Sequence, residues 1–257
     1  MLSLILAATA LAWQAADPAA DGLKALEQEK WADAAAAFEK VVAADAKRVD
    51  GFFNLGFAYS MLEKDDLAIA AYRKALAIDG EIAEARLNLG MVLLRNKKAT
   101  EAIAELELAV PKKPAAKQYL AEALLQSGQA EKAEAAYKEL DQKSAAVQAG
   151  LARALATQGK LNDAVAAYQR AAELDPAFRD AIVELGSSLE AAGRKKEAAE
   201  VYAKAAPTPA VVERLGVLRL ETGDLAGAIA ALEMVVKQSP TAANRFALAK
   251  AYLRSKQ

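Results

Sequence analysis

The feature of this sequence that most constrains its fold is an internal repeat, in which residues of one kind recur at fixed offsets. A small residue is followed twelve positions later by alanine, and four positions after that by an aromatic residue or leucine. The small column consists of Gly22, Gly56, Gly90, Ala121, Ala152, Gly186, Gly216 and Ala249, whose members lie 30 to 34 residues apart. A period of this length predicts an open array of stacked units.

The other two columns run through the same seven repeats. The alanine column is Ala34, Ala68, Ala102, Ala133, Ala164, Ala198 and Ala228, and the bulky column is Phe38, Tyr72, Leu106, Tyr137, Tyr168, Tyr202 and Leu232. Two antiparallel helices can approach to about 8 Å only where the contact residues lack bulk. We therefore expect Gly56 to pack against Ala68, and the bulky column to fill the space toward the next unit.

Apolar residues recur at helical spacing inside each repeat, as in residues 52–61 and 67–76. Polar breaks separate the two stretches, and several contain a glycine that suits a left-handed residue at a helix end. No segment shows sustained alternation of apolar and polar residues with β-branched side chains. The sequence therefore predicts an all-α chain of helical pairs.

The pattern resembles the tetratricopeptide repeat (TPR) family, whose helix–turn–helix units follow a signature of small, alanine, aromatic and proline positions. The second repeat carries it as Leu55, Gly56, Tyr59, Ala68, Tyr72 and Ala75, and the fifth closes with Ala164, Tyr168, Ala171 and Pro176. The resemblance implies a right-handed α-solenoid of about seven repeats plus a C-terminal capping helix. The expected spans are 17–48, 49–82, 83–113, 114–144, 145–178, 179–208 and 209–241, with a terminal helix at 242–257.

The N-terminal residues 1–12 form a short apolar run that ends in small residues. Such a run, followed by the possible cleavage motif at 10–12, predicts a signal peptide over residues 1–16 and a periplasmic or secreted protein. No Lys or Arg precedes the run, so the alternative is a hydrophobic first helix that caps the solenoid of a cytoplasmic protein. The resemblance is thus to a TPR protein of exported bacterial type. The mature chain is expected to lack a membrane-spanning segment.

The C-terminal segment is expected to form one helix without a partner helix after it. Phe246, Leu248, Ala249 and Tyr252 are expected to face the last full repeat, whereas Lys250, Arg254 and Lys256 face water. Terminal repeats need a polar outer face for solubility.

The composition argues against an enzyme. The chain has no histidine and no cysteine, which removes thiol nucleophiles, imidazole acid–base catalysis and the usual zinc or haem ligands. The net charge is −1 with interspersed signs, so no nucleic-acid surface is expected. We therefore expect no catalytic residue, no cofactor and no metal site.

Candidate binding residues follow from the TPR-like architecture, in which the first helix of each pair lines the concave face. The candidates for contact with a protein or peptide partner are Phe53, Asn54, Phe57, Met61, Leu87, Asn88, Met91, Leu94, Arg95 and Tyr119. Asn54 and Asn88 lie one repeat apart, and their amides could pair with an extended peptide backbone. Alternatively, the asparagines are merely solvated and some apolar residues pack against neighbouring helices.

The sequence accordingly predicts a non-enzymatic protein–protein interaction scaffold. Exposed apolar residues on one concave surface usually mark a partner site. The alternative is a structural or self-associating component of a cell-envelope assembly that uses its convex or end faces.

Overall fold

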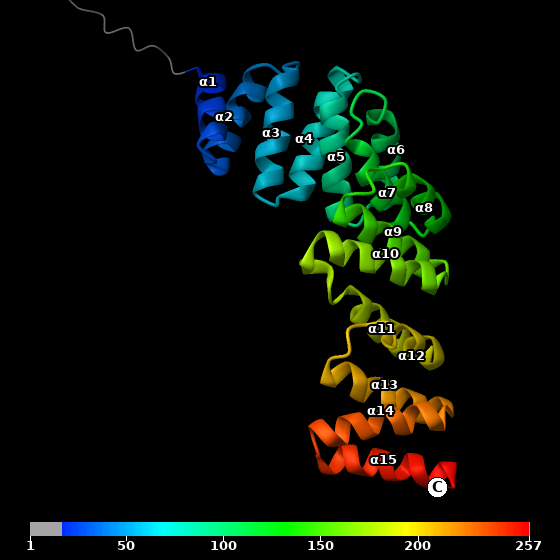
Figure 1. Ribbon diagram of the computed structural model, residues 1–257. Helices are drawn as coiled ribbons and strands as arrows, with labels where there is room; N and C mark the ends of the chain where they lie inside the picture. The colour runs from blue at the N-terminus through cyan, green and yellow to red at the C-terminus, as the bar shows by residue number, and fades with distance from the viewer. Residues whose placement is uncertain (1–16, 257) are drawn as a thin grey trace, which may run out of the picture. The chain divides into compact units, whose positions relative to one another are not determined.

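The computed structural model describes residues 17–256, which form α-helices and one short 3-10 helix but contain no strand within that range (Figure 1). Seven helical pairs are followed by a single helix, α15. The predicted all-α array of repeats with a terminal helix is therefore confirmed. The predicted signal peptide, residues 1–16, lies outside the described residues.

The described residues divide into two compact units between Tyr119 and Leu120. The first unit contains α1 (Pro18–Glu27), α2 (Trp31–Ala44), α3 (Val49–Met61), α4 (Asp65–Ile78), α5 (Ala83–Arg95) and α6 (Ala99–Ala109). Helix α7 (Ala116–Gln126) begins in this unit and continues into the second.

The second unit holds the remaining helices. They are α8 (Ala130–Lys138), α9 (Ala145–Thr157), α10 (Leu161–Leu174), the 3-10 helix η1 (Pro176–Phe178), α11 (Ala181–Ala191), α12 (Lys195–Tyr202), α13 (Pro209–Thr222), α14 (Leu225–Gln238) and α15 (Ala242–Ser255). Within each unit, helices pack chiefly against their neighbours in the sequence, as in other repeat arrays.

The glycines of the small column allow a bulky residue of the same repeat to cross the first helix. A Cβ added at Gly56 would lie 2.9 Å from Cδ1 of Tyr72, and one added at Gly90 would lie 2.5 Å from Cγ of Leu106. The ring or leucine occupies the volume that the missing side chain leaves in its own pair. The predicted reach toward the next repeat is also present at Tyr72, whose hydroxyl lies near Asn88.

The turn between the two helices of a pair contains a left-handed residue, whose type differs between the units. In the first unit Glu29, Glu63 and Lys97 have φ values of 56°, 57° and 57°. In the second unit glycines take this conformation, with φ between 76° and 91°, at Gly128, Gly159, Gly193 and Gly223. Only the second unit thus uses the residue that tolerates this backbone without steric cost.

Helix α15 packs against α14 through a face that differs from the predicted one. Leu248 is half-buried against the last pair and Ala251 is fully buried, but Phe246 is 72% exposed and Ala249 is also exposed. The prediction for Phe246 and Ala249 was wrong because small-column residues meet the second helix of their own repeat. In the described residues α15 has no such helix.

Candidate functional site

The predicted binding residues of α3 and α5 fall into matching rows. Asn54, Phe57 and Met61 follow one face of α3 at i, i+3 and i+7, and Asn88, Met91 and Arg95 occupy the equivalent positions of α5. The two helices lie in contact. The structure therefore brings these six residues together, and we call them the first-unit patch.

The patch combines exposed methionines with half-buried neighbours. Met61 is 44% exposed and Met91 is 37% exposed, whereas Asn54, Phe57 and Asn88 are half-buried. Methionine adapts its shape readily to different apolar partners. The surface thus offers flexible apolar contact beside two amides that can each donate and accept hydrogen bonds.

The aromatic rings beside the patch are held by neighbouring helices. Phe57 makes an edge-to-face contact with Trp31 of α2, with 6.0 Å between ring centroids, and Phe53 makes a similar contact with Tyr72 of α4 at 5.9 Å. Such pairs stabilise by about 0.5–1.5 kcal/mol beyond the area that they bury. Phe53 and Phe57 therefore contribute to packing as well as to the inward face.

Three of the remaining candidates serve the fold or lie elsewhere. Leu94 is buried at 8% exposure and lies one turn after Gly90, on the side of α5 that Leu106 of α6 covers. Half-buried Leu87 flanks the patch, and Tyr119 lies on α7 at the end of the first unit. Leu94 is therefore unable to contact a partner directly.

Arg95 belongs to the patch by position but is already engaged at its head group. Its Nε donates to Asp65 Oδ1 at 2.9 Å, and its Nη2 donates to the backbone oxygen of Ser60 at 2.9 Å. These bonds tie the end of α5 to the α3–α4 turn and raise the pKa of Arg95, first through the hydrogen bond to Asp65. Arg95 acts mainly as a clamp between repeats.

A buried hydroxyl lies beneath the patch. Tyr72 is fully buried, and its hydroxyl has no partner in hydrogen-bonding geometry among the described residues. Burial raises the pKa of Tyr72, while the nearby Asn88 amide and Arg95 guanidinium oppose that rise. Asn88 thus lies near this hydroxyl without the geometry of a full hydrogen bond.

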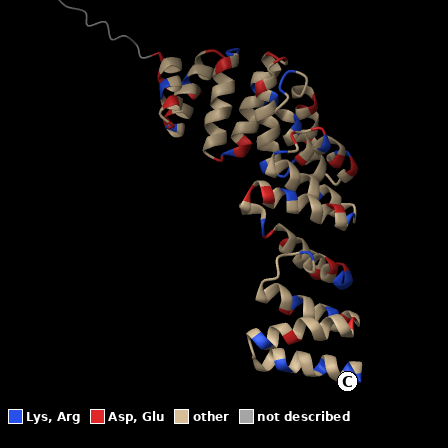
Figure 2. Cartoon of the chain, in the orientation of Figure 1, with Lys and Arg blue, Asp and Glu red and all other residues tan. Residues whose placement is uncertain are grey.

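The first helices of the second unit carry ion pairs at their inward positions. Arg153 of α9 donates to Glu122 of α7 at 2.7 Å, and Arg214 of α13 donates to Glu190 of α11 at 2.7 Å. Burial of Glu122 favours its neutral form, but bonds from Arg153 and Gln126 outweigh that effect and lower its pKa. Figure 2 shows both charge signs interspersed along the helices.

Two hollows flank these ion pairs, and sequence reasoning did not predict them. One of about 420 Å³ lies around Arg153, with Leu125, Leu185 and Tyr168 among its lining residues. Another of about 550 Å³ lies around Glu190 and Arg214. The inward positions of these charged residues were readable from the repeat register, but the hollows depend on how the surrounding side chains pack.

The asparagine row ends at Asn88, because Tyr119 holds the equivalent position of α7, and in the following repeat a side chain is excluded for a steric reason. Gly150 of α9 takes the position equivalent to Asn54 and Asn88, and a Cβ built there would overlap the ring of Tyr137 from α8. The Tyr137 hydroxyl then donates to Glu122 Oε2 at 2.9 Å. In this repeat the aromatic ring fills the place where an asparagine would stand.

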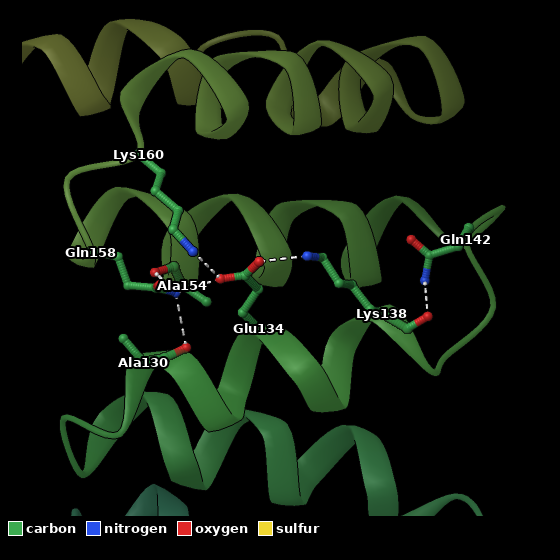
Figure 3. Close-up of polar contacts among 7 residues, drawn as sticks. All are labelled: Ala130, Glu134, Lys138, Gln142, Ala154, Gln158 and Lys160. Carbon is green, nitrogen blue, oxygen red and sulfur yellow. Dashed lines mark hydrogen bonds and ion pairs between the residues drawn. The ribbon is translucent and has the colours of Figure 1, made fainter.

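A charged cluster joins α8 to the α9–α10 turn (Figure 3). Glu134 is 9% exposed and accepts bonds from Lys138 at 2.5 Å, Gln158 at 2.8 Å and Lys160 at 2.9 Å. These bonds, that of Lys138 first, lower the pKa of Glu134 to about 2. Glu134 therefore stays ionised over the physiological range and fastens two consecutive repeats together.

Residues 17–256 contain no group of three or more acidic, histidine or cysteine side chains placed to hold a metal ion. None of the helices in this range is both long enough and apolar enough to cross a bilayer.

Family models decide the classification. The tetratricopeptide repeat model matches residues 19–81, 66–117 and 150–211, and a second tetratricopeptide repeat model matches residues 213–242. The chain belongs to the tetratricopeptide repeat family. TPR proteins typically mediate protein–protein interaction and are generally non-catalytic scaffolds.

Solved TPR structures resemble this chain in fold. A MamA crystal structure is 23% identical, covers 64% of this chain and 92% of its own, and has a TM-score of 0.57. A tetratricopeptide repeat protein from Parabacteroides merdae is 12% identical, covers 91% and 97%, and has a TM-score of 0.60. Naa15/Naa10 bound to HypK-THB is 17% identical, covers 92% and 39%, and has a TM-score of 0.52. The comparison with curated proteins finds no match.

Proposed function

We propose that this TPR protein is a scaffold without catalytic activity that holds a peptide segment of a partner protein on the first-unit patch. The observation that carries the proposal is the pair of rows on α3 and α5, where exposed Met61 and Met91 lie beside Asn54 and Asn88. Methionine side chains would supply adaptable apolar contact, and the amides would pair with the peptide backbone. The Naa15/Naa10 structure bound to HypK-THB provides an example of a similar fold in complex with a partner.

The test places charge on the patch without disturbing the interior. Met61→Glu combined with Met91→Glu changes two exposed side chains, so folding should be retained. A carboxylate buried against an apolar partner costs several kcal/mol, and specific partners should therefore be lost from pull-downs of a cell-envelope extract. Asn88→Ala should weaken binding of the captured partner by about fivefold, in line with loss of a hydrogen bond of about 1 kcal/mol.

A matched control uses the second helices of the same unit. Leu67 of α4 is 48% exposed and Leu108 of α6 is 58% exposed, so Leu67→Glu with Leu108→Glu adds the same two charges on other surfaces. This control should retain the partners. If both double variants and the wild type capture the same proteins, the patch is not the binding surface.

We also propose that the protein is exported, on the basis of the apolar leader at residues 1–16. N-terminal sequencing of protein from its native cell should find a first residue between Trp13 and Asp17. Recovery of Met1 on cytoplasmic protein would exclude export. Exclusion of export would leave the scaffold proposal intact, because the patch does not involve the leader, and the pull-down would then use a cytoplasmic extract.

A further inference from the structure

The outer face of α15 carries an apolar stripe that no helix covers in the described residues. Ala242, Phe246, Ala249 and Leu253 follow one another at i, i+4, i+7 and i+11, so they share one side of the helix. Phe246 at 72% and Leu253 at 80% are the most exposed large apolar residues of the described range. This stripe lies opposite the side that packs on α14.

Basic residues border the stripe on both sides. Lys250 and Arg254 lie along one edge and Arg245 lies along the other, as their helical positions require, and Lys256 follows the end of the helix. Arg254 Nη1 donates to the backbone oxygen of Leu220, and Glu221 of α13 lies near Lys250. The segment after Thr241 contains no acidic residue, although the whole chain has a net charge of −1. Figure 2 shows basic residues and no acidic residue on α15. Arg245, Lys250 and Lys256 therefore place positive charge beside the stripe.

Equivalent stripes elsewhere in this chain are covered by a helix. Phe53 and Gly56 hold the positions of Phe246 and Ala249, and the ring of Tyr72 from α4 covers both. Gly90 in α5 is covered in the same way by Leu106 of α6. The surface of α15 thus has the register that receives a second helix in the preceding repeats.

We propose that the α15 stripe binds an amphipathic α-helix of a partner protein, whose apolar seam is flanked by Asp or Glu. The spacing of the stripe matches the seam of two packed helices, in which residues beside the seam select partners by charge. The alanines leave grooves between Phe246 and Leu253 for the partner's larger side chains. The binding surface is separate from the first-unit patch and does not depend on that proposal.

The charges and the shape of the stripe favour this occupant over two others. A symmetric contact between two copies of α15 would bring Arg245 and Lys250 of each copy together, and like charges in such seams are unfavourable. An anionic membrane would suit the charges, but only Phe246 and Leu253 could enter it as large apolar side chains.

The experiment uses two designed helical peptides with the same leucine and alanine seam, one flanked by glutamate and the other by lysine. Fluorescence anisotropy with the full chain should show binding of the glutamate peptide and at least about tenfold weaker binding of the lysine peptide. Phe246→Ser with Leu253→Ser should weaken binding of the glutamate peptide at least about tenfold, with an unchanged helical circular dichroism spectrum.

A charge exchange separates specific docking from general attraction. Arg245→Glu with Lys250→Glu should reverse the preference toward the lysine peptide, whereas Arg170→Glu with Lys237→Glu, which gives the same net charge on α10 and α14, should not. Equal affinity for both peptides, or an equal effect of both double variants, overturns the proposal. Concentration-dependent self-association lost with Phe246→Ser, or binding of phosphatidylserine vesicles without binding of the peptide, also overturns it.

Discussion

The first unit presents Asn54, Asn88 and Met91 on its inward face, whereas the second unit presents the Glu122–Arg153 and Glu190–Arg214 pairs. Both units nevertheless repeat the same small, alanine and bulky columns. The columns fix how helices pack, because each bulky residue needs a small residue opposite. Inward positions escape that constraint, and their chemistry can differ from one repeat to the next.

The largest effect is expected from extending the asparagine row into the second unit. Gly150→Asn should lower the free energy of unfolding by about 2–3 kcal/mol, because the new Cβ would overlap the rigid Tyr137 ring. Urea unfolding followed by circular dichroism measures the change. The loss should exceed the gain of about 0.5 kcal/mol that replacing a helical glycine normally brings.

A second substitution tests the cause of that loss. Tyr137→Leu introduces the residue found at Leu106 of the third repeat and removes the ring, so it should recover much of the stability in the Gly150→Asn background. The two substitutions should therefore be strongly non-additive, as expected of residues in contact. Simple additivity would show that the ring does not limit this position.

A smaller effect is expected from making the second unit resemble the first at Glu134. The equivalent residues of the first unit, Ala35, Ile69 and Ile103, are apolar. The folded pKa of Glu134, about 2, lies below the ordinary value of 4.5, so its stabilisation is present above pH 4.5 and is lost as the pH falls toward 2. Glu134→Ile should reduce the loss of unfolding free energy between pH 7 and pH 2.5 by about 1–2 kcal/mol, allowing for partly exposed lysine partners.

The Glu134→Ile variant should be nearly as stable as the wild type at pH 7, because an apolar residue can replace a buried ion pair when its partners reach water. Lys138 and Lys160 have side chains 58% and 47% exposed and can do so. A Glu81→Ile variant provides the control, since Glu81 is an exposed ion-pair partner. An equal change of acid dependence in both variants would contradict the role assigned to Glu134.

The fold was predictable because its cause is local and repeated. Spacing of Gly56 and Tyr72 recurs along the chain, and helical periodicity surrounds each pair. The burial of Leu94 and the exposure of Phe246 were predicted incorrectly, since both depend on which helix covers each side of a first helix. The sequence shows the spacing between the columns, but it does not show which neighbouring helix contacts each side of a first helix.

The candidate site was less predictable, because side-chain partners come from other repeats. Arg95 donates a hydrogen bond to Asp65, which lies 30 residues away in the sequence. Its guanidinium is therefore less available for contact with a partner. Asn88 lies near the Tyr72 hydroxyl. The repeat register predicts that Tyr72 lies on α4, but it does not predict the direction of its hydroxyl. The repeat register predicts which residues lie on the inward face. Hydrogen bonds made by long side chains determine which of these residues can contact a partner.

The smallest effect is expected from exchanging turn residues between the units. Glu63→Gly should raise the free energy of unfolding by about 0.5 kcal/mol, because relief of the left-handed strain exceeds the extra entropy of an unfolded glycine. Gly159→Glu should lower it by a similar amount, since its φ is 76°. Lys74→Gly in the middle of α4 should instead cost about 1 kcal/mol, since no left-handed strain exists there to relieve. Adding Glu29→Gly and Lys97→Gly to Glu63→Gly should produce a nearly additive gain in the free energy of unfolding, because distant sites act independently.

Urea unfolding of all the variants measures these differences. A destabilised Glu63→Gly protein would show that a contact of the Glu63 side chain stabilises the fold by more than the left-handed backbone costs.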